Sequence, residues 1–479
     1  MHLSKAYDYL SLDSASALPL YRQLYQRVRE VIERGMLKAG DRMPATRLLA
    51  GEAGLARGTV SAAYDLLAAE GFLEVRGTAG YVVAHNKVAA TERRTQPARR
   101  QQQKRSKPLP IDVGGAGTPL PFQLGLPALD AFPRKLWARL SAGVARTTQS
   151  DNMVRELAFG APALRAAIAS HLKLSRSVNC TPEQVFIVSG YRDALDLIQR
   201  TLLTSGQRVW VEEPVYPPTA QVLRGCGMQT VSVPVDQDGI DVARGMALAP
   251  DAAAAVVTPA HQSPLTVTLS AARRRALLDW AASAGSWIIE DDYDGEFRLA
   301  GRPLPALASM DSAGRVLYFG SFSKVIFPSL RLSYVVVPPT LVERFEDSVA
   351  LLGRGVPGFV QAIVCDFMLE GHLMRHIQRM RKLYNERRSM VTATLNQALA
   401  GHADIVPQAG GLHLLARTPL GADRALAAKL QSHGLAAMAL SDWFLGEPTQ
   451  SGLLFSYTNV SSPELAQTLS RKVAEALDH

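Results

Sequence analysis

The chain has 479 residues, 47% of them hydrophobic, and a formal net charge of +9. This length suffices for two or three domains with a sizeable core. No run of eighteen apolar residues and no signal-peptide core occurs, so we expect neither membrane insertion nor export and place the protein in the cytoplasm.

The first predicted elements form a small domain of three helices and a hairpin. Apolar residues at helical spacing predict helices over 21–34, 46–53 and 57–70, separated by glycine-containing turns. Apolar residues at 72–76 and 81–83 flank a glycine-containing turn and predict a β-hairpin. A helix, a turn and a second helix are the pattern that presents the second helix to the major groove of DNA.

The wording PLYRQLYQRVREVI, GDRMPATRLLA and ARGTVSAAYDLLAAEGFLEVR resembles the winged helix-turn-helix of the GntR family over about residues 18–84. The resemblance implies that double-stranded DNA is a partner. It places the following residues at the DNA: Arg47, Arg57, Thr59, Arg76, Gly77 and Gly80. The set predicts phosphate contacts and leaves base contacts open. Residues 1–84 hold ten basic and nine acidic residues, so affinity must come from the placement of charge.

Residues 85–118 are predicted to be a flexible basic linker between domain 1–84 and domain 119–479. Eight basic residues and one acidic residue lie between 87 and 107, among Gln, Pro, Ser and Thr and with almost no large apolar residues. As a coil, the linker spans about 30 Å. It is either a solvated spacer or a polybasic arm that adds phosphate contacts to DNA.

Two apolar strands of the second domain end at polar or aromatic residues. The strand at 209–211 leads to Tyr216, an aromatic residue that could stack on a ring. The strand at 256–257 leads to His261 and Gln262, and Gln262 could donate to a ring hydroxyl. Each feature alone is more often ordinary strand-end polarity, so its weight depends on the later segments of the chain.

The strand at 287–289 ends in an acidic cluster with a tyrosine. Ligands bind at strand ends in open α/β sheets, and a carboxylate of this cluster can pair with a protonated pyridine nitrogen. Tyr293 can hydrogen-bond a ring hydroxyl. A solvated turn and a metal site are the alternatives. No histidine or cysteine lies near the cluster in the sequence, so we expect a cofactor carboxylate and no metal.

The segment Ser321-Phe322-Ser323-Lys324, followed by Arg331, places an amine among groups that bind phosphate. A lysine that bonds to the aldehyde of pyridoxal phosphate needs hydroxyls and a guanidinium nearby to hold the phosphate. The strand at 316–319 leads into this segment. The sequence therefore predicts a pyridoxal phosphate site that combines this lysine with the preceding strand ends.

With TPAHQSP, IIEDDYDGEF and GSFSKVIFPSLRLSY, the chain from about Phe122 to its C-terminus resembles the fold-type I aminotransferases, and it is close to the MocR/GabR regulators. The resemblance implies pyridoxal 5'-phosphate as cofactor and an α/β domain with a mixed, mostly parallel seven-stranded sheet. It makes Lys324 the catalytic lysine, Asp291 the partner of the pyridine nitrogen, and Tyr293 and Gln262 the partners of the ring hydroxyl. It further implies Tyr216 on the ring face, with the phosphate held by Gly190, Tyr191, Ser321, Ser323 and Arg331. Members are generally homodimers with sites at the interface.

The chain departs from the family pattern at several positions. Asp442 stands where many members carry an arginine that anchors a carboxylate, although Arg417 could compensate. We therefore expect an effector pocket that includes both residues and favours an amine that lacks a simple α-carboxylate or carries an additional cationic group. Arg155 replaces a tyrosine that relatives supply from the neighbouring subunit, and Thr266 replaces a glycine. These changes make efficient transamination less expected.

Two classes of function remain open from the sequence. The first is a pyridoxal phosphate-dependent transcriptional regulator that senses an amine-bearing effector, or the cofactor itself. The alternative is a catalytically active aminotransferase with an accessory DNA-binding domain. The intact helix and hairpin motifs favour the regulator, and two DNA-reading domains on one dimer would imply paired half-sites in the operator.

Overall fold

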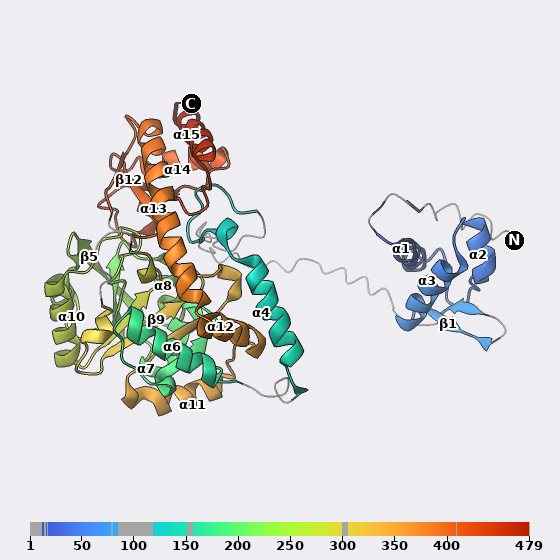
Figure 1. Cartoon of the computed structure of the whole chain (residues 1–479), viewed down its shortest axis with the longest axis horizontal. Helices are drawn as coiled ribbons and strands as arrows, with labels where there is room; N and C mark the ends of the chain where they lie inside the picture. The colour runs from blue at the N-terminus through green and yellow to red at the C-terminus, as the bar shows by residue number, and fades with distance from the viewer. Residues whose placement is uncertain are drawn as a thin grey trace. The chain divides into compact units, whose positions relative to one another are not determined.

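The computed structural model describes residues 12–13, 16, 18–77, 80–84, 118–150, 157–298, 305–408 and 410–478. The chain divides into two compact units, Met1–Ser106 and Lys107–His479, and each is described by itself (Figure 1). The expected linker, apart from Thr118, and the family departure at Arg155 lie outside the described residues. Their structural roles stay predictions.

The N-terminal unit has the elements that the sequence predicts, with ends that differ by one or two residues. Its helices are α1 (Leu20–Glu33), α2 (Thr46–Glu52) and α3 (Arg57–Ala69), and β1 (Leu73–Val75) pairs antiparallel with β2 (Tyr81–Val83). Leu24, Leu49, Val60, Tyr64 and Leu67 are almost fully buried. These residues form one apolar core, which fixes α3 against α1 and leaves the first residue of α3 exposed.

The centre of the second unit is an eight-stranded sheet in the order β3-β10-β9-β8-β7-β4-β5-β6. Its strands are β3 (Val185–Val188), β4 (Arg208–Glu213), β5 (Gln229–Asp236), β6 (Gly239–Ile240), β7 (Ala254–Val257), β8 (Trp287–Asp292), β9 (Val316–Ser321) and β10 (Ser333–Val336). Pairs between β5 and β9 are parallel, whereas β10 is antiparallel to both of its neighbours. The predicted number of seven strands is wrong by one, because the two-residue β6 folds back on β5.

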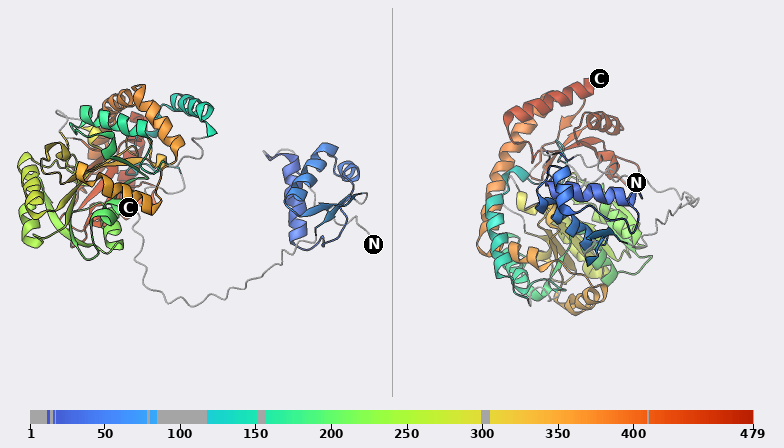
Figure 2. Two further views of the ribbon diagram at one scale, coloured as in Figure 1. Left: turned by 90° about the horizontal axis from the view of Figure 1, so that it is seen from below. Right: turned by 90° about the vertical axis from the view of Figure 1, so that its right-hand side faces the viewer.

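Helices cover both faces of this sheet (Figures 1 and 2). Successive strand residues point to opposite faces. Accordingly, Val209 and Val211 of β4 share a core with α7 (Tyr191–Leu202), α8 (Pro217–Gly225) and α11 (Val342–Leu352). Trp210 between them stacks on Trp280 at a centroid distance of 3.8 Å. Trp280 lies on α10 (Ala271–Ala284), which shares that face with α9 (Val242–Leu248). A third core joins α4 (Arg134–Thr147), α6 (Pro162–Ser175) and α12 (Gly358–Leu369) with Val185 and Ile187 of β3.

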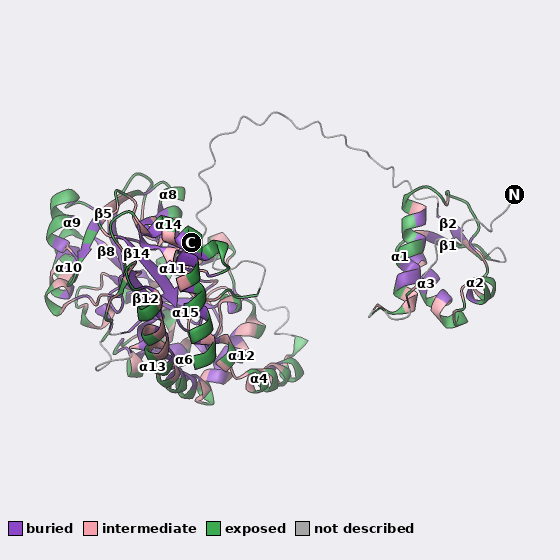
Figure 3. Cartoon of the chain, turned by 90° about the horizontal axis from the view of Figure 1, so that it is seen from above, coloured by how far each residue is buried: buried purple, intermediate pink, exposed green. Residues whose placement is uncertain are grey.

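A smaller C-terminal layer is built on an antiparallel sheet in the order β11-β12-β14-β13. Its elements are β11 (Asp404–Ile405), β12 (His413–Arg417), α14 (Asp423–Ser432), β13 (Met438–Ala439), β14 (Gly452–Ser456) and α15 (Pro463–Asp478). The 27-residue helix α13 (His372–Ala398) runs from α12 to this layer (Figure 1). Figure 3 shows that the central strands of both sheets are buried. In the part of the chain that the structure describes, no helix is long and apolar enough to cross a membrane.

Candidate cofactor site and DNA-binding face

The predicted site residues follow strands whose carboxyl ends meet at one edge of the large sheet. Parallel pairing gives β4, β7, β8 and β9 the same direction, and β3 shares it because β10 is antiparallel to both β3 and β9. Gly190 follows β3, Tyr216 follows β4, and Lys324 follows β9. This edge is where open α/β sheets bind ligands.

Lys324 is partly buried, and its Nζ donates a hydrogen bond to the carbonyl oxygen of Gly125 at 2.7 Å. Burial lowers the pKa of Lys324 from 10.5 to about 8, although Asp294 and Asp291 oppose the change. A larger neutral fraction makes the amine a better nucleophile near neutral pH. Gly125 was not predicted as a site residue. Its only signal in the sequence is its residue type, since glycine reaches its φ of 81° without strain.

Asp291 is 5% exposed, and its Oδ1 accepts no hydrogen bond from the described residues. Burial raises its pKa well above the usual range, and Asp292, Asp294 and Glu212 raise it further, while Lys324 lowers it. A buried carboxylate without a donor is costly unless a cation pairs with it. The site can therefore accept a protonated ring nitrogen or another cationic group at Asp291.

Tyr293 and Gln262 were both predicted to contact a ring hydroxyl, and the structure gives them different surroundings. The hydroxyl of Tyr293 is buried and faces Ser263, which was not predicted as a site residue. The amide of Gln262 is used within the protein. Its Nε2 donates to the carbonyl oxygen of Pro214 at 2.8 Å, and its Oε1 accepts from the amide of Leu265 at 2.9 Å. Gln262 thus holds its own loop, and Tyr293 remains the better candidate for a ligand hydroxyl.

The predicted stacking residue, Tyr216, lies in an aromatic cluster. Its ring centroid is 5.8 Å from that of Tyr191 and 5.8 Å from that of Trp443. Burial raises the pKa of Tyr216 to about 12 and keeps its hydroxyl neutral. The hydroxyls of Tyr191 and Thr219 lie 2.7 Å apart. Tyr191 is thereby held beside Tyr216, and the two rings form an apolar wall of the site.

The predicted phosphate cup consists of a helix N-terminus, a guanidinium and hydroxyls. Gly190, with a φ of 106°, precedes α7, and no side chain caps this helix. A Cβ on Gly190 would lie 3.7 Å from the guanidinium carbon of Arg331, which places that cation at the free amides. The Ser321 hydroxyl accepts from the amide of Ser323 at 3.2 Å. Free amides and a guanidinium together suit a phosphate dianion.

A buried histidine lies beside the acidic cluster in space, although none is near it in the sequence. His261 Nδ1 is 2.9 Å from Asp294 Oδ1, and both side chains are 1% exposed. A Cβ on Gly410 would lie 2.8 Å from His261 Cε1, so this position has room only for glycine. Nevertheless, the described residues contain no group of three or more His, Cys, Asp or Glu that could hold a metal ion.

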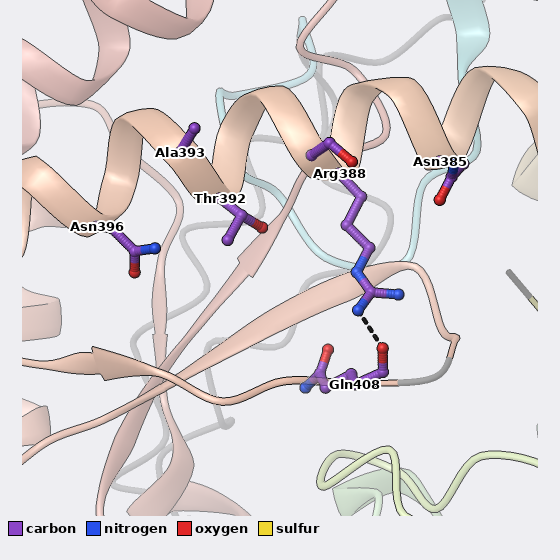
Figure 4. A pocket seen from close by; sticks show the side chains of 7 residues that line it. Asn385, Arg388, Thr392, Ala393, Asn396 and Gln408 are labelled. Atoms are coloured by element: carbon purple, nitrogen blue, oxygen red, sulfur yellow. Dashed lines mark hydrogen bonds between the residues drawn. The ribbon is translucent and has the colours of Figure 1, made fainter. Parts of the chain in front are cut away.

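The segment before Gly410 is anchored by α13. Arg388 on this helix donates to the carbonyl oxygen of Gln408, as Figure 4 shows. The contact forms one wall of an open polar groove of about 490 Å³, lined by Asn385, Arg388, Ser389, Thr392, Ala393, Asn396 and Gln408. None of the predicted site residues lines this groove.

Asp442, one of the two predicted effector residues, is not an unpaired charge. Arg424 Nε donates to Asp442 Oδ1 at 2.7 Å, with side-chain exposures of 58% and 31%. The expectation that Asp442 repels a carboxylate stays a prediction, and its basis is weaker because α14 supplies a compensating cation. Arg417 is exposed at the far end of β12 from His413, a buried residue that faces Lys324 and Asp294.

Next to Asp442, the loop after β13 is attached to the large sheet. The amide of Val215 donates to the carbonyl oxygen of Trp443 at 2.9 Å, and the amide of Leu445 donates to Glu213 Oε1 at 2.6 Å. These bonds place Trp443 against Tyr216. The loop therefore borders the site through Trp443 and not through the charge of Asp442.

In the N-terminal unit, the predicted DNA-binding residues Arg47 and Arg57 are exposed. Arg57 is the first residue of α3, whose N-terminus has no side-chain cap and no acidic residue in its first turn. Thr59 is half-buried in the same turn. This arrangement offers free amides and a guanidinium to a phosphate. Arg76 differs, because its Nη2 lies 3.2 Å from Glu74 Oε2.

The two wing glycines, Gly77 and Gly80, have positive φ angles of 46° and 75°, and a Cβ on either would meet no atom within 4 Å. Nothing in the described part of the unit therefore fills the space at these positions. This openness agrees with a close approach of DNA to the backbone, and the individual contacts stay predictions.

Comparisons with known proteins match both units. The family of bacterial regulatory proteins of the gntR type matches residues 20–83, and aminotransferase class I and II matches residues 148–452. The probable rhizopine catabolism regulatory protein MocR of Rhizobium meliloti is 36% identical, covering 96% of this chain and 94% of its own. The pyridoxine biosynthesis transcriptional regulator PdxR of Corynebacterium glutamicum is 32% identical, covering 91% of each chain.

A solved structure supports the fold of the second unit. The α-aminoadipate aminotransferase LysN of Thermus thermophilus, complexed with N-(5'-phosphopyridoxyl)-L-leucine, superposes with a TM-score of 0.68 at 24% identity. The match covers 75% of this chain and 92% of LysN. The predicted fold class, a winged helix-turn-helix followed by an α/β aminotransferase domain, is confirmed.

Proposed function

This chain belongs to the MocR-type transcriptional regulators, in which a gntR winged helix is joined to a class I and II aminotransferase domain, and we propose that it senses an amine through bound pyridoxal 5'-phosphate. The observation that carries this proposal is the convergence of Lys324, Asp291 and the Gly190–Arg331 phosphate cup at one sheet edge. An amine, a buried unpaired carboxylate and an anion site are the three groups that the cofactor requires.

When bound, pyridoxal phosphate supplies an aldehyde that reacts with amines and a ring that withdraws electrons. Each residue has one task toward it. Asp291 holds the ring nitrogen in its protonated form, Tyr216 covers the ring face, and Tyr293 hydrogen-bonds the ring hydroxyl. The N-terminus of α7 and Arg331 bind the phosphate. Lys324 supplies the protein's own amine to the cofactor aldehyde when no effector is bound. Its lowered pKa favours its replacement by the amine of an effector.

The proposal specifies only one chemical group of the effector, its amine. The Asp442–Arg424 pair has no net charge, so it gives no reason to exclude a carboxylate from the site. The cofactor itself is the second candidate signal, because a relative that covers 91% of both chains is named a regulator of pyridoxine biosynthesis. Comparing DNA binding without cofactor, with cofactor, and with cofactor plus amine separates the two signals.

The gntR-type domain binds DNA, and we propose that a homodimer presents two such domains to paired half-sites. Arg57 and the free amides of α3 contact phosphate in this proposal, and Arg47 adds a second contact. Binding to chromosomal DNA places the protein in the cytoplasm. Its oligomeric state is measured by analytical ultracentrifugation with and without DNA.

The test of cofactor binding uses purified full-length protein, pyridoxal phosphate and borohydride reduction. Mass spectrometry should find one reduced adduct per chain, on Lys324. Lys324→Ala should lose it, whereas Lys382→Ala, a change at an exposed lysine of α13, should retain it. A wild-type protein without any adduct at saturating cofactor contradicts the proposal. Sustained amine turnover with no change in DNA binding would favour the alternative, a working aminotransferase.

A further inference from the structure

The residue that follows Asp291 belongs to a buried ion pair. Arg176 Nε lies 2.6 Å from Asp292 Oδ2, and the side chains are only 4% and 3% exposed. The Tyr318 hydroxyl donates to the same oxygen at 2.5 Å. Removing one member of such a pair leaves an uncompensated buried charge, which is strongly unfavourable. Arg176 therefore compensates the buried charge at the end of β8, the strand that carries Asp291.

Arg176 also holds the turn after β8. Its Nη1 donates to the carbonyl oxygen of Gly295 at 3.3 Å, and its own carbonyl oxygen accepts from the amide of Ala306 at 3.0 Å. A Cβ on Gly295 would lie 2.8 Å from Arg176 Nη2, so the turn is packed onto the guanidinium. Tyr293 and Asp294 lie within this turn. Arg176, which follows the last residue of α6, thus holds the turn that contains these two site residues.

Asp291 and Asp292 point to opposite faces of the sheet, because successive strand residues alternate. The charge of Asp292 still raises the pKa of Asp291, second only to burial. Other groups that face Asp291 are Asp294 and Glu212, which raise its pKa, and Lys324, which lowers it. The phenols of Tyr191, Tyr216 and Tyr293 face it as well.

We infer that Arg176 is a positioning residue for Asp291. It compensates the charge of Asp292 and fixes the turn, so that Asp291 is the carboxylate left to pair with a cation in the site. The inference rests on the proposed function, in which that cation is the ring nitrogen of the cofactor. Arg176 acts on Asp291 through its ion pair with Asp292 and its hydrogen bond to the backbone of Gly295.

The experiment compares Arg176→Met, Asp292→Asn and the double variant with Arg274→Met as a matched control. Arg274 is also a buried arginine, at 5% exposure, but its guanidinium donates to the carbonyl oxygens of Leu269, Pro259 and Pro305. Loss of Arg274 leaves unpaired carbonyl oxygens, whereas Asp292 keeps its ion pair with Arg176. Urea unfolding of every variant reports the purely structural cost.

Affinity for pyridoxal phosphate from pH 6 to 9 is the first readout. Arg176→Met should weaken binding about tenfold at pH 7, the equivalent of one pKa unit at Asp291, and should move the acid limb of the profile to higher pH. Asp292→Asn should move that limb to lower pH. The double variant should bind within about threefold of wild type, because neither charge remains. Arg274→Met should not move the limb.

The second readout is the pH midpoint of trace acetylation at Lys324, measured in cofactor-free protein. Asp291 raises the pKa of Lys324 when it is ionised. Arg176→Met should therefore lower the pH midpoint of trace acetylation at Lys324, and Asp292→Asn should raise it. Equal profiles for Arg176→Met and Arg274→Met, or additive losses in the double variant, overturn the inference. If wild-type protein binds no cofactor, the proposed function fails, while this second readout still decides the role of Arg176.

Discussion

The lowered pKa of Lys324 leads to a prediction that needs no cofactor. Burial brings this pKa from 10.5 to about 8. At pH 7, the neutral fraction of the amine then rises from about one in 3,000 to about one in ten, a gain of about 300-fold in reactive amine. The perturbation to test is Asp294→Asn, because Asp294 is the carboxylate that most strongly opposes this decrease.

The assay is trace acetylation with acetic anhydride across pH 6 to 11, followed by quantitation of each lysine by mass spectrometry. The midpoint for wild-type Lys324 should lie near pH 8. Exposed Lys382 serves as an internal reference for reagent decay and pH. Asp294→Asn should lower the Lys324 midpoint, since removal of a nearby anion destabilises the ammonium form.

The sign of the stability effect follows from the same shift. Between the folded pKa of about 8 and the unfolded pKa of 10.5, the unfolded state binds more protons at this residue, so its contribution to stability rises with pH in that window. A Lys324 midpoint close to 10.5, or an Asp294→Asn midpoint above that of wild type, refutes the reasoning from burial and charge.

Three further predictions concern other parts of the molecule. Arg57→Ala should weaken operator binding and reduce the salt slope by about one unit, whereas exposed Arg27 on α1 should tolerate alanine; fluorescence anisotropy at several salt concentrations checks both. Asp423→Ala should cost about 3 kcal/mol in urea unfolding, because this fully buried carboxylate accepts hydrogen bonds from two backbone amides of the loop and strand beside it. Asp442→Ala, at an exposed ion pair, should cost less than about 1 kcal/mol, and equal costs would contradict the comparison. Gly190→Ala should lower the free energy of unfolding, followed by fluorescence, by about 1–3 kcal/mol, because alanine is strained at a φ of 106°. It should also weaken pyridoxal phosphate binding, because Gly190 lies beside the predicted phosphate cup, and an unchanged affinity counts against that cup.

The sequence alone was sufficient for the elements of the N-terminal unit and for the four strands that lead to the predicted site residues. The helices of the N-terminal unit follow from apolar spacing, and the strands before Asp291 and Lys324 are apolar runs that end in polar residues. Because parallel strands share a direction, polar residues at their carboxyl ends meet without further information. Motif order therefore determined which residues gather, although β6 was too short to predict.

The partners of these residues were decided only by the tertiary structure. Arg176, Gly125 and Arg424 come from segments remote from Asp292, Lys324 and Asp442, and nothing in the local pattern marks them. From the sequence, the charge of Asp442 was expected to repel a carboxylate. In the structure, an arginine 18 residues away in the chain forms an ion pair with it. Electrostatics depends on distance and burial, which local sequence does not contain, whereas hydrophobic periodicity is local and can be read directly.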